Sequence, residues 1–347
     1  MKNIAVVGLG YWGPNLARCV ASSRNLQITY LVDSKSAALK RLPEDIRNGA
    51  KLVANLEEPL EDPNLDGLIL ATPASTHSQM VDMSLERDLH LYIEKPLMFN
   101  SGLWNRARAI VEHGPRVIFP GYLYFFNNLV KQALEVIQSG LIGEIVHISS
   151  SRRNYGPIRS DVSAAWDLLV HDLSIAKKLT QSSFRRVLAT GQSWTSHGVW
   201  DNVSASIELV DGVTMDSNVS WLFPRKERLF VVQGAKGVLV MEETNPDAPL
   251  RVFSRLGFFD YTQSVITRFE DFQSTIQSAD MIWQAQGKSE DTLQTAINSF
   301  SAAMTDKDSV QFPTLDFAAD IEATVTAVEK SILVGNWVEV TPTDRSS

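Results

Sequence analysis

The sequence has very little cysteine, no long apolar run and no surplus of basic residues. Its single cysteine, Cys19, cannot form an internal disulfide or a cysteine-based zinc site. We therefore expect no bound metal and a location in the reducing cytoplasm. No stretch approaches about 18 uninterrupted apolar residues, so we expect no membrane span. Lys and Arg number 32 against 40 Asp and Glu, a formal net charge of −8. A nucleic-acid binder more often carries a basic surplus, so we expect no nucleic-acid partner.

The length of 347 residues indicates two domains. As far as residue 122, short apolar runs alternate with helical patterns. The first run leads directly into a glycine-rich turn, which is typical of a buried strand and not of a signal peptide. Continuous apolar runs are typical of parallel strands covered on both faces, and the alternating order favours a doubly wound α/β sheet over residues 1–122. Strands are predicted at 4–7, 28–32, 67–71, 90–93 and 117–120, and helices at 14–22, 36–42, 77–87 and 103–113.

The second part of the chain, residues 123–347, has a different pattern. Its segments alternate apolar and polar residues with period two, and Asp211-Gly212 is a strong hairpin signal. This pattern predicts an α+β domain with a large, mostly antiparallel open sheet. Strands are predicted at 144–151, 186–194, 202–210, 213–221, 228–233 and 237–242, and helices at 127–139, 166–180, 289–303 and 317–334. The stretch 257–289 has the weakest pattern.

A glycine-rich motif, Gly8-Leu9-Gly10-Tyr11-Trp12-Gly13, follows the first strand and opens a helix. This context is typical of a dinucleotide-binding turn, in which the glycines permit the tight turn, the approach of the pyrophosphate and close helix packing. Asp33 ends the second strand, 20 residues after Gly13. An acid there hydrogen-bonds a ribose 2′-hydroxyl and repels a 2′-phosphate, so we expect NAD to be preferred over NADP.

Two further strand ends carry candidate residues. Thr72, Pro73 and His77 follow the third strand at the carboxyl edge, where ligands bind in such sheets. Glu94-Lys95-Pro96 follows the next strand, and a lysine there can polarise a hydroxyl or carbonyl group. Each motif alone also fits an interpretation without a functional role, which is a capped helix start for the first motif and a surface lysine for the second.

Asp167 and His171 lie four residues apart at the start of the predicted helix 166–180. They therefore share a helix face, where a carboxylate can fix the tautomer of an imidazole and leave one ring nitrogen free as an acid or base. The alternative is an ion pair on a helix surface.

Taken together, these motifs resemble the glucose–fructose oxidoreductase / inositol dehydrogenase family. The likeness lies in GLGYWG at 8–13, ATPASTH at 71–77, EKP at 94–96, PGY at 120–122, GLIGEI at 140–145 and WDLLVHDLSI at 166–175. It implies an NAD-binding Rossmann domain over residues 1–122 and a substrate-binding and oligomerisation domain over residues 123–347. It also implies that Lys95, Asp167 and His171 are catalytic. The residues expected to contact NAD are Gly8, Gly10, Tyr11, Trp12, Gly13, Asp33, Thr72, Pro73, His77, Glu94 and Lys95.

Within that family, GYWGPN and the run 153–161 look most like bacterial nucleotide-sugar 3-dehydrogenases, which oxidise UDP-N-acetylglucosamine uronate for surface polysaccharide. The resemblance predicts hydride transfer from a sugar hydroxyl, at C3 of a nucleotide-linked sugar. The residues expected at the substrate are Lys95, Tyr122, Arg153, Asn154, Tyr155, Arg159 and His171. The arginines suit bidentate contact with a carboxylate or phosphate, or they are solvated edge charges.

Three alternatives stay open at this point: reduction of a 3-keto sugar, an inositol or polyol dehydrogenase, and a non-catalytic dinucleotide-binding sensor. We also expect a homodimer or homotetramer built sheet to sheet. Val203, Ile207, Val213, Val219 and Trp221 lie in alternating strands and are not expected all to face the same helices, and large exposed apolar patches usually mark interfaces.

Overall fold

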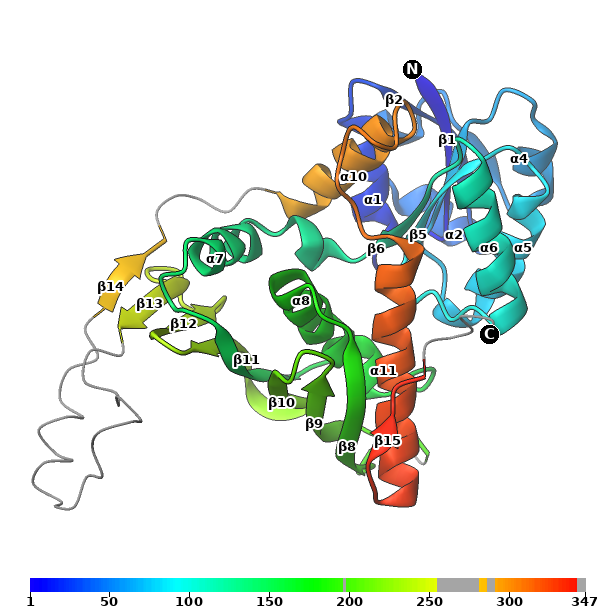
Figure 1. Cartoon of the computed structure of the whole chain (residues 1–347). Coiled ribbons are helices and arrows are strands. Elements are labelled where there is room, and N and C mark those ends of the chain that lie inside the picture. Colours follow the sequence, from blue (N-terminus) through cyan, green and yellow to red (C-terminus); the bar gives the residue numbers. More distant parts are fainter. Residues whose placement is uncertain (196–197, 255–280, 286–290, 342–347) are drawn as a thin grey trace, which may run out of the picture. The chain divides into compact units, whose positions relative to one another are not determined.

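A computed structural model describes residues 1–195, 198–254, 281–285 and 291–341. The weakly patterned stretch 257–289 lies largely outside these residues. The described chain forms two compact units (Figure 1). The first unit contains residues 1–126 and 291–323, and the second contains residues from 127 to 285 and 324–340. Each unit is described by itself.

The first unit is built on a parallel sheet of six strands in the order β3-β2-β1-β4-β5-β6. This is the doubly wound arrangement predicted from the alternating runs. The short strand β3 was missed, because its three residues carry no continuous apolar run. The strands are β1 (Lys2–Val7), β2 (Leu26–Val32), β3 (Lys51–Val53), β4 (Gly67–Leu70), β5 (His90–Glu94) and β6 (Ile118–Gly121).

The helices of the first unit lie between these strands and in a segment from the end of the chain. They are α1 (Gly13–Ala21), α2 (Ser36–Arg41), α3 (Glu44–Arg47), α4 (Glu57–Glu61), α5 (His77–Leu85), α6 (Ser101–His113), α10 (Thr292–Ala303) and the first part of α11 (Leu315–Val334). Two short 3₁₀ helices, η1 (Ala74–Thr76) and η2 (Leu123–Phe126), follow β4 and β6. Helix α10 belongs to the segment that the sequence grouped with residues 123–347, whereas in the structure it packs in the first unit.

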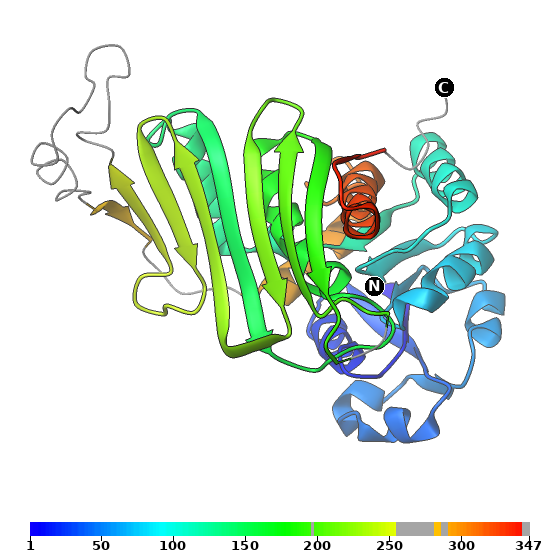
Figure 2. The same ribbon diagram turned by 90° about the horizontal axis from the view of Figure 1, so that it is seen from below.

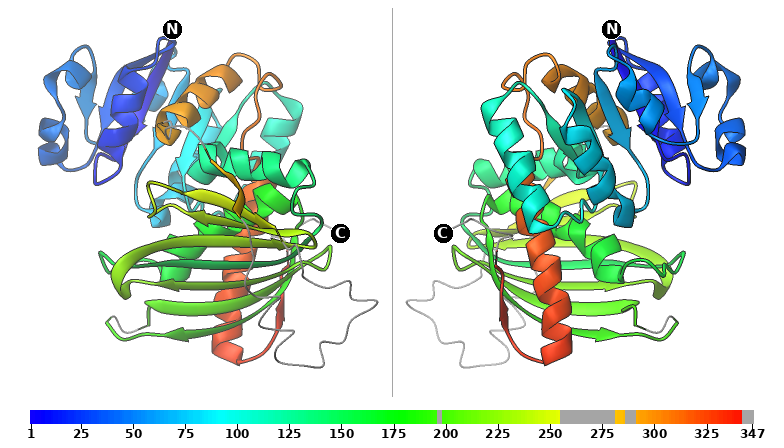
Figure 3. Two further views of the ribbon diagram at one scale, coloured as in Figure 1. Left: turned by 90° about the vertical axis from the view of Figure 1, so that its left-hand side faces the viewer. Right: turned by 90° about the vertical axis from the view of Figure 1, so that its right-hand side faces the viewer.

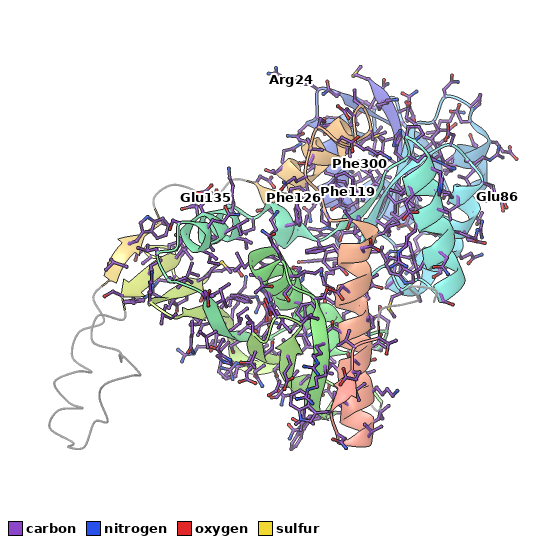
Figure 4. The ribbon with its side chains drawn as sticks, viewed as in Figure 1. Arg24, Glu86, Phe119, Phe126, Glu135 and Phe300 are labelled. Carbon is purple, nitrogen blue, oxygen red and sulfur yellow. The ribbon has the colours of Figure 1, made fainter. Side chains whose placement is uncertain are left out.

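The reason for this placement is the apolar face of α10. Leu293, Ile297 and Phe300 lie at helical spacing and join the buried core of the six-stranded sheet. The Phe300 ring lies 5.7 Å from the Phe119 ring of β6, and the three labelled phenylalanines of this cluster lie next to one another in Figure 4. The third, Phe126, stacks on Phe119 at 5.6 Å. The late helix therefore completes the core of the nucleotide-binding fold.

The second unit is built on a nine-stranded sheet in the order β14-β13-β12-β11-β7-β10-β9-β8-β15. Only the pair β7–β10 is parallel, so the sheet is mostly antiparallel, as predicted. Its strands are β7 (Ile145–Tyr155), β8 (Phe184–Gln192), β9 (Asn202–Leu209), β10 (Thr214–Ser220), β11 (Leu222–Gly234), β12 (Gly237–Glu242), β13 (Leu250–Ser254), β14 (Met281–Gln284) and β15 (Val338–Glu339). Its helices are α7 (Asn128–Gln138), η3 (Ala165–Leu169), α8 (Val170–Thr180) and the second part of α11.

The two faces of this sheet differ in chemistry. In register, Val203 of β9 pairs with Val219 of β10, so their side chains share one face, and both are buried. Figure 2 looks onto the other face, which no described helix crosses. That open face carries polar side chains in β9 and β10, including Ser204, Ser206 and Asp216.

The register corrects the reasoning offered for a sheet-to-sheet interface. The five apolar residues named for it are all buried within the single chain: Val203, Ile207, Val213, Val219 and Trp221. They form no exposed apolar patch, and the argument for self-association from them was wrong.

Helix α11 closes one edge of the second unit. Its second part runs beside β8 and β15 (Figure 3). The Ser331 hydroxyl accepts a hydrogen bond from the Ala189 amide of β8 at 2.9 Å and donates one to the Asn336 carbonyl at 2.7 Å. One small side chain thus joins the helix, the strand β8 and the turn that follows the helix.

Candidate cofactor-binding and catalytic residues

The glycine-rich turn between β1 and α1 has the backbone that a dinucleotide requires. Gly8 has φ +88°, and a Cβ on it would lie 2.8 Å from the Ala71 carbonyl group. A Cβ on Gly13 would lie 1.9 Å from the Gly8 oxygen, so only glycine allows α1 to begin there. Gly10 differs, because a Cβ on it would meet nothing within 4 Å. It is an exposed bare backbone next to a helix N-terminus, which fits the approach of a pyrophosphate.

Asp33 stands at the end of β2 and is held by the backbone. Its carboxylate accepts hydrogen bonds from the Leu9 amide at 2.7 Å and the Lys35 amide at 2.8 Å. A carboxylate has about four lone-pair positions, so both bonds leave capacity for a ribose hydroxyl. The bond to Leu9 ties the acid directly to the glycine-rich turn.

Glu94, the last residue of β5, also joins this turn. Its Oε1 accepts a hydrogen bond from the Trp12 indole Nε1 at 2.9 Å and lies 3.4 Å from the Tyr92 hydroxyl. Burial raises the pKa of Glu94 to about 7, while the charge of Lys95 and the bond from Trp12 act in the opposite direction. Trp12 and Glu94 therefore connect the two motifs through side chains. Tyr11, by contrast, is almost fully exposed.

His77 and Thr72 form a second connection at the same edge of the sheet. The ring nitrogens of His77 lie 2.9 Å from the Pro96 carbonyl oxygen and 3.0 Å from that of Thr72. The imidazole is buried, and this burial lowers its pKa. His77 thus joins two loops and presents no exposed surface for contact with a cofactor, whereas Thr72 and Pro73 remain accessible.

Lys95 follows β5 directly, and it is the one residue from Leu91 to Leu97 that is not buried. The turn after it is held by Glu322 of α11, whose carboxylate accepts hydrogen bonds from the Leu97 amide at 2.5 Å and the Met98 amide at 3.0 Å. Burial raises the pKa of Glu322 to about 7, and both amide bonds oppose that effect. Sequence analysis missed Glu322, because nothing in an amphipathic helix distinguishes this glutamate from a surface one.

Tyr122, which is expected at the substrate, is buried in the first unit. Only 1 % of the residue is exposed, its ring packs edge-on against Phe317 at 5.8 Å, and its hydroxyl lies 3.4 Å from Glu322. It is a core residue of the first unit that supports Glu322.

In the second unit, Asp167 and His171 stand out by their exposure. All the other residues from Val162 to Ala176 are buried, so only these two reach the surface. The predicted helix over 166–180 is present, but it begins as a π-helix, η3, before α8 continues it. Wider turns of this kind are frequent at functional sites. The helix therefore presents one carboxylate and one imidazole from an otherwise apolar, buried stretch.

Asp167 is held by side chains from two other segments. Its Oδ2 accepts a hydrogen bond from the Trp221 indole Nε1 at 3.0 Å, and its Oδ1 lies 3.5 Å from the Arg159 guanidinium. Arg159 also makes a bidentate pair with Asp161, with bonds of 2.9 and 2.6 Å. Arg159 is thus a partner of two carboxylates. Trp221, which sequence analysis treated as an interface residue, instead orients Asp167.

The neighbours Arg152 and Arg153 point to opposite faces of β7, as period-two alternation requires. Arg152 is 3 % exposed, and its Nε donates to Asp172 of α8 at 2.7 Å. Arg153 pairs with Glu227 at 2.7 Å and lies 4.0 Å from the Phe223 ring, in a shallow hollow of the open face. Arg152 therefore lies on the face of the sheet that α8 covers, and Arg153 lies on the open face. The strand register does not support a contact between Arg153 and a substrate held beside His171.

Asn154 and Tyr155 complete the predicted substrate residues. The side-chain Oδ1 of Asn154 accepts a hydrogen bond from Arg228 at 2.6 Å, and Tyr155 is 76 % exposed at the end of β7. Among the residues that the structure describes, no group of histidine, cysteine and acidic side chains could hold a metal ion. None of the described helices is long and apolar enough to cross a membrane.

Comparison with known proteins covers both units. The family described as "Oxidoreductase family, NAD-binding Rossmann fold" matches residues 2–122, and the family described as "GFO/IDH/MocA C-terminal domain" matches residues 130–240. The chain is 24% identical over 193 residues to myo-inositol 2-dehydrogenase of Thermotoga maritima, which covers 54% of this chain and 58% of that one. It is 25% identical over 237 residues to scyllo-inositol 2-dehydrogenase (NAD(+)) of Bacillus subtilis, covering 63% and 67%.

Solved structures share the fold over nearly the whole length. GenD2 from gentamicin A biosynthesis, in complex with NAD, has a TM-score of 0.78 at 20% identity, covering 98% of this chain and 96% of that one. The myo-inositol dehydrogenase of Lactobacillus casei, in complex with NAD(H) and myo-inositol, has a TM-score of 0.76 at 17% identity, covering 98% and 97%. With both of its domain families matched and the glycine-rich turn shaped for a dinucleotide, the chain belongs to the Gfo/Idh/MocA family of NAD-binding oxidoreductases.

Proposed function

We propose that the protein is an NAD-dependent dehydrogenase that oxidises a secondary hydroxyl of a sugar, at C3 of a nucleotide-linked sugar. The observation that carries this proposal is the exposure of Asp167 and His171 alone from an otherwise buried stretch of helix. A carboxylate and an imidazole that alone reach the surface of an otherwise buried stretch of helix fit acid–base chemistry better than a solvated surface pair. The glycine-rich turn of the first unit supports the cofactor part of the proposal.

In this proposal each of the three residues has a separate role at one hydroxyl. His171 accepts the hydroxyl proton as the C–H bond of the same carbon breaks, and Asp167 stabilises the imidazolium that forms. Lys95 stabilises the negative charge that develops on the oxygen. NAD, when bound, supplies the nicotinamide carbon that accepts the hydride. That Lys95 of the first unit and His171 of the second act on one substrate rests on the family likeness and on this division of chemistry.

The anchoring of Asp167 supports its role as an orienting group. Trp221 and Arg159 both contact the carboxylate, so it is fixed in position before substrate binds. A charge fixed in advance stabilises a developing positive charge without paying for reorganisation in the transition state.

Asp33 supports a preference for NAD over NADP. Its carboxylate is fixed by two backbone amides at the end of β2, so a 2′-phosphate placed there would meet a negative charge that cannot turn away. Dissociation constants of both cofactors, measured by calorimetry on the unmodified protein, test this. The proposal requires tighter binding of NAD, and tighter binding of NADP contradicts it.

A second candidate is an inositol or polyol dehydrogenase, and the two relatives named above favour it, since both are inositol 2-dehydrogenases by name. A panel of nucleotide sugars, sugar acids, free sugars and inositols, each mixed with NAD and the protein and followed by NADH absorbance, separates the candidates. The first requires turnover with a nucleotide-linked sugar, and the second requires turnover with a free cyclitol. Tight NAD binding without turnover on any member of the panel would contradict both.

We also propose a homodimer or homotetramer in which the open face of the nine-stranded sheet is covered by a second copy. On β11 to β13 that face carries the half-buried apolar residues Leu229, Val231, Val238, Val240 and Phe253, which are not the ones first named for it. Light scattering should give a multiple of the 38.6 kDa chain mass, and a value near one chain would overturn this.

A further inference from the structure

Glu322 is an unusual residue for the position that it occupies. It lies on α11 and is only 4 % exposed, although it carries a carboxylate. Removing a charge from water is costly unless hydrogen bonds compensate for it. The compensation comes from the amides of Leu97 and Met98 and from the hydroxyl of Tyr122, at 2.5, 3.0 and 3.4 Å. The glutamate is thus bonded to the turn that begins immediately after Lys95.

That turn is held mainly by side chains. The Pro96 carbonyl contacts the His77 ring at 2.9 Å, and the Met98 carbonyl accepts a hydrogen bond from the Ser78 hydroxyl at 2.8 Å. Strand β5 ends at Glu94, so no sheet ladder guides the backbone at these positions. The side chains that bond this turn therefore fix the course of the chain on the far side of Lys95.

A carboxylate suits this position better than other side chains of similar size. It offers two acceptor oxygens and no donor, and two neighbouring amide N–H groups need two acceptors. A glutamine has one carbonyl oxygen and one NH₂ group, and the NH₂ group would face one of the two amide donors. The choice of a buried acid over its neutral isostere is explained by the need to bind both amides at once.

From these contacts we infer that Glu322 is a positioning residue, which sets the direction of the backbone after Lys95 and so the place of the Lys95 ammonium group. The inference rests on the proposed function for the role of Lys95 in turnover. The placement of the lysine itself does not depend on that role.

The variant Glu322→Gln tests the inference, because it keeps the volume of the side chain and removes one acceptor. We expect kcat to fall about 10- to 100-fold, the size of loss that a small displacement of a reacting group causes. KM and the dissociation constant of NAD should change by no more than about twofold, since Glu322 bonds the turn after Lys95 and the Tyr122 hydroxyl. Glu322→Asp keeps both oxygens on a shorter side chain and should recover part of the loss. Asp316→Asn, an exposed acid on the same helix that pairs with Arg108, is the matched control and should behave as the unmodified protein does.

A readout that does not need turnover separates failure of this inference from failure of the proposed function. Lysines of the full chain are reductively methylated with ¹³C-formaldehyde, and the Lys95 resonance is assigned by its absence from Lys95→Arg. We expect the Lys95 resonance and its titration midpoint to move in Glu322→Gln, to return partly in Glu322→Asp and to stay in place in Asp316→Asn. If Glu322→Gln does not fold, the shift in Glu322→Asp decides. A lower melting temperature with an unmoved Lys95 resonance would show a purely structural role and overturn the inference, whatever the substrate screen finds.

Discussion

The candidate site residues of the two units are held in different ways, apart from Glu94 of the first unit, which accepts a hydrogen bond from the Trp12 side chain. In the first unit, Asp33 and Glu322 accept hydrogen bonds from backbone amides, and His77 contacts backbone carbonyls. In the second unit, Asp167 and Asp172 are held by other side chains, an indole and a guanidinium among them. The first kind of contact depends on the course of the chain, and the second depends on which residues happen to face each other.

This difference bears on how substrate specificity changes among related enzymes. A group bonded to the backbone keeps its place when neighbouring side chains are replaced, which suits a cofactor shared by a whole family. A group bonded to side chains moves when any one partner is replaced, which suits a site whose substrate varies. We therefore expect substitutions around the candidate site of the second unit to alter substrate choice more readily than substitutions around that of the first.

The largest effect is expected from His171. His171→Asn should lower turnover by roughly 10²- to 10⁴-fold, because general acid–base catalysis typically contributes that much. His147→Asn is the matched control, since His147 lies on β7 and hydrogen-bonds Thr214 on the open face of the sheet. Steady-state rates of both variants with the substrate found in the screen decide the matter. Turnover of His171→Asn within a few-fold of the unmodified protein would mean that the base is elsewhere.

Trp221 provides the next test, because it should act only through Asp167. Trp221→Phe removes the indole N–H that donates to the carboxylate and keeps most of the packing. We expect kcat to fall by about tenfold, in line with the loss of one well-placed hydrogen bond to a charged group. Trp194→Phe is the control, because that indole is 74 % exposed and bonds only to a surface glutamine in the described structure. Equal kinetics for the two variants would contradict an orienting role for Trp221.

Arg152 and Arg153 test whether neighbouring residues on the two faces of β7 differ as described. Arg152→Ala leaves Asp172 buried without its guanidinium and should cost about 3–5 kcal/mol of unfolding free energy. Arg153→Ala loses a partly exposed ion pair and a ring contact and should cost about 1 kcal/mol, with turnover almost unchanged. Urea unfolding of both variants measures the difference. A larger loss for Arg153 would reverse the assignment of faces.

The last effect concerns the pH dependence that Glu94 contributes. Burial raises its pKa to about 7 in the folded protein, against 4.5 for an ordinary glutamate, so the folded state binds the proton more tightly. The stability contributed is therefore present at low pH and is lost as the pH rises from about 4.5 to about 7. Across that window the melting temperature of the unmodified protein should fall relative to that of Glu94→Gln. Above about pH 7 the two melting temperatures should run parallel. A constant difference across the window would contradict the raised pKa.

Much of the fold and part of the site follow from the sequence alone. The order of buried runs and helices predicts a parallel sheet and five of its six strands, and the glycine spacing predicts a turn that only glycine can adopt at Gly8 and Gly13. These features are local, so the sequence displays them directly. The place of α10 in the first unit could not be predicted, because two helices with apolar faces look alike wherever they dock.

The side-chain contacts of the site that the sequence did not reveal have the same origin. Whether Arg152 or Arg153 faces α8 depends on the strand register, and a one-residue shift exchanges the two. That Tyr122 is buried and that Trp221 reaches Asp167 are contacts between distant segments, without a local signal. Glu322 lies 225 residues from the turn that it holds.

We propose that the first unit holds NAD and that the second unit carries out the proton transfer. Calorimetric titration of NAD into Gly10→Ala and His171→Asn tests this most directly. A Cβ on Gly10 meets nothing within 4 Å in the protein, so the variant should fold normally and yet obstruct the pyrophosphate. We expect at least about tenfold weaker NAD binding for Gly10→Ala, in line with the cost of one added methyl group in a close contact, and binding within about twofold of normal for His171→Asn. Normal binding by Gly10→Ala together with weakened binding by His171→Asn would contradict it.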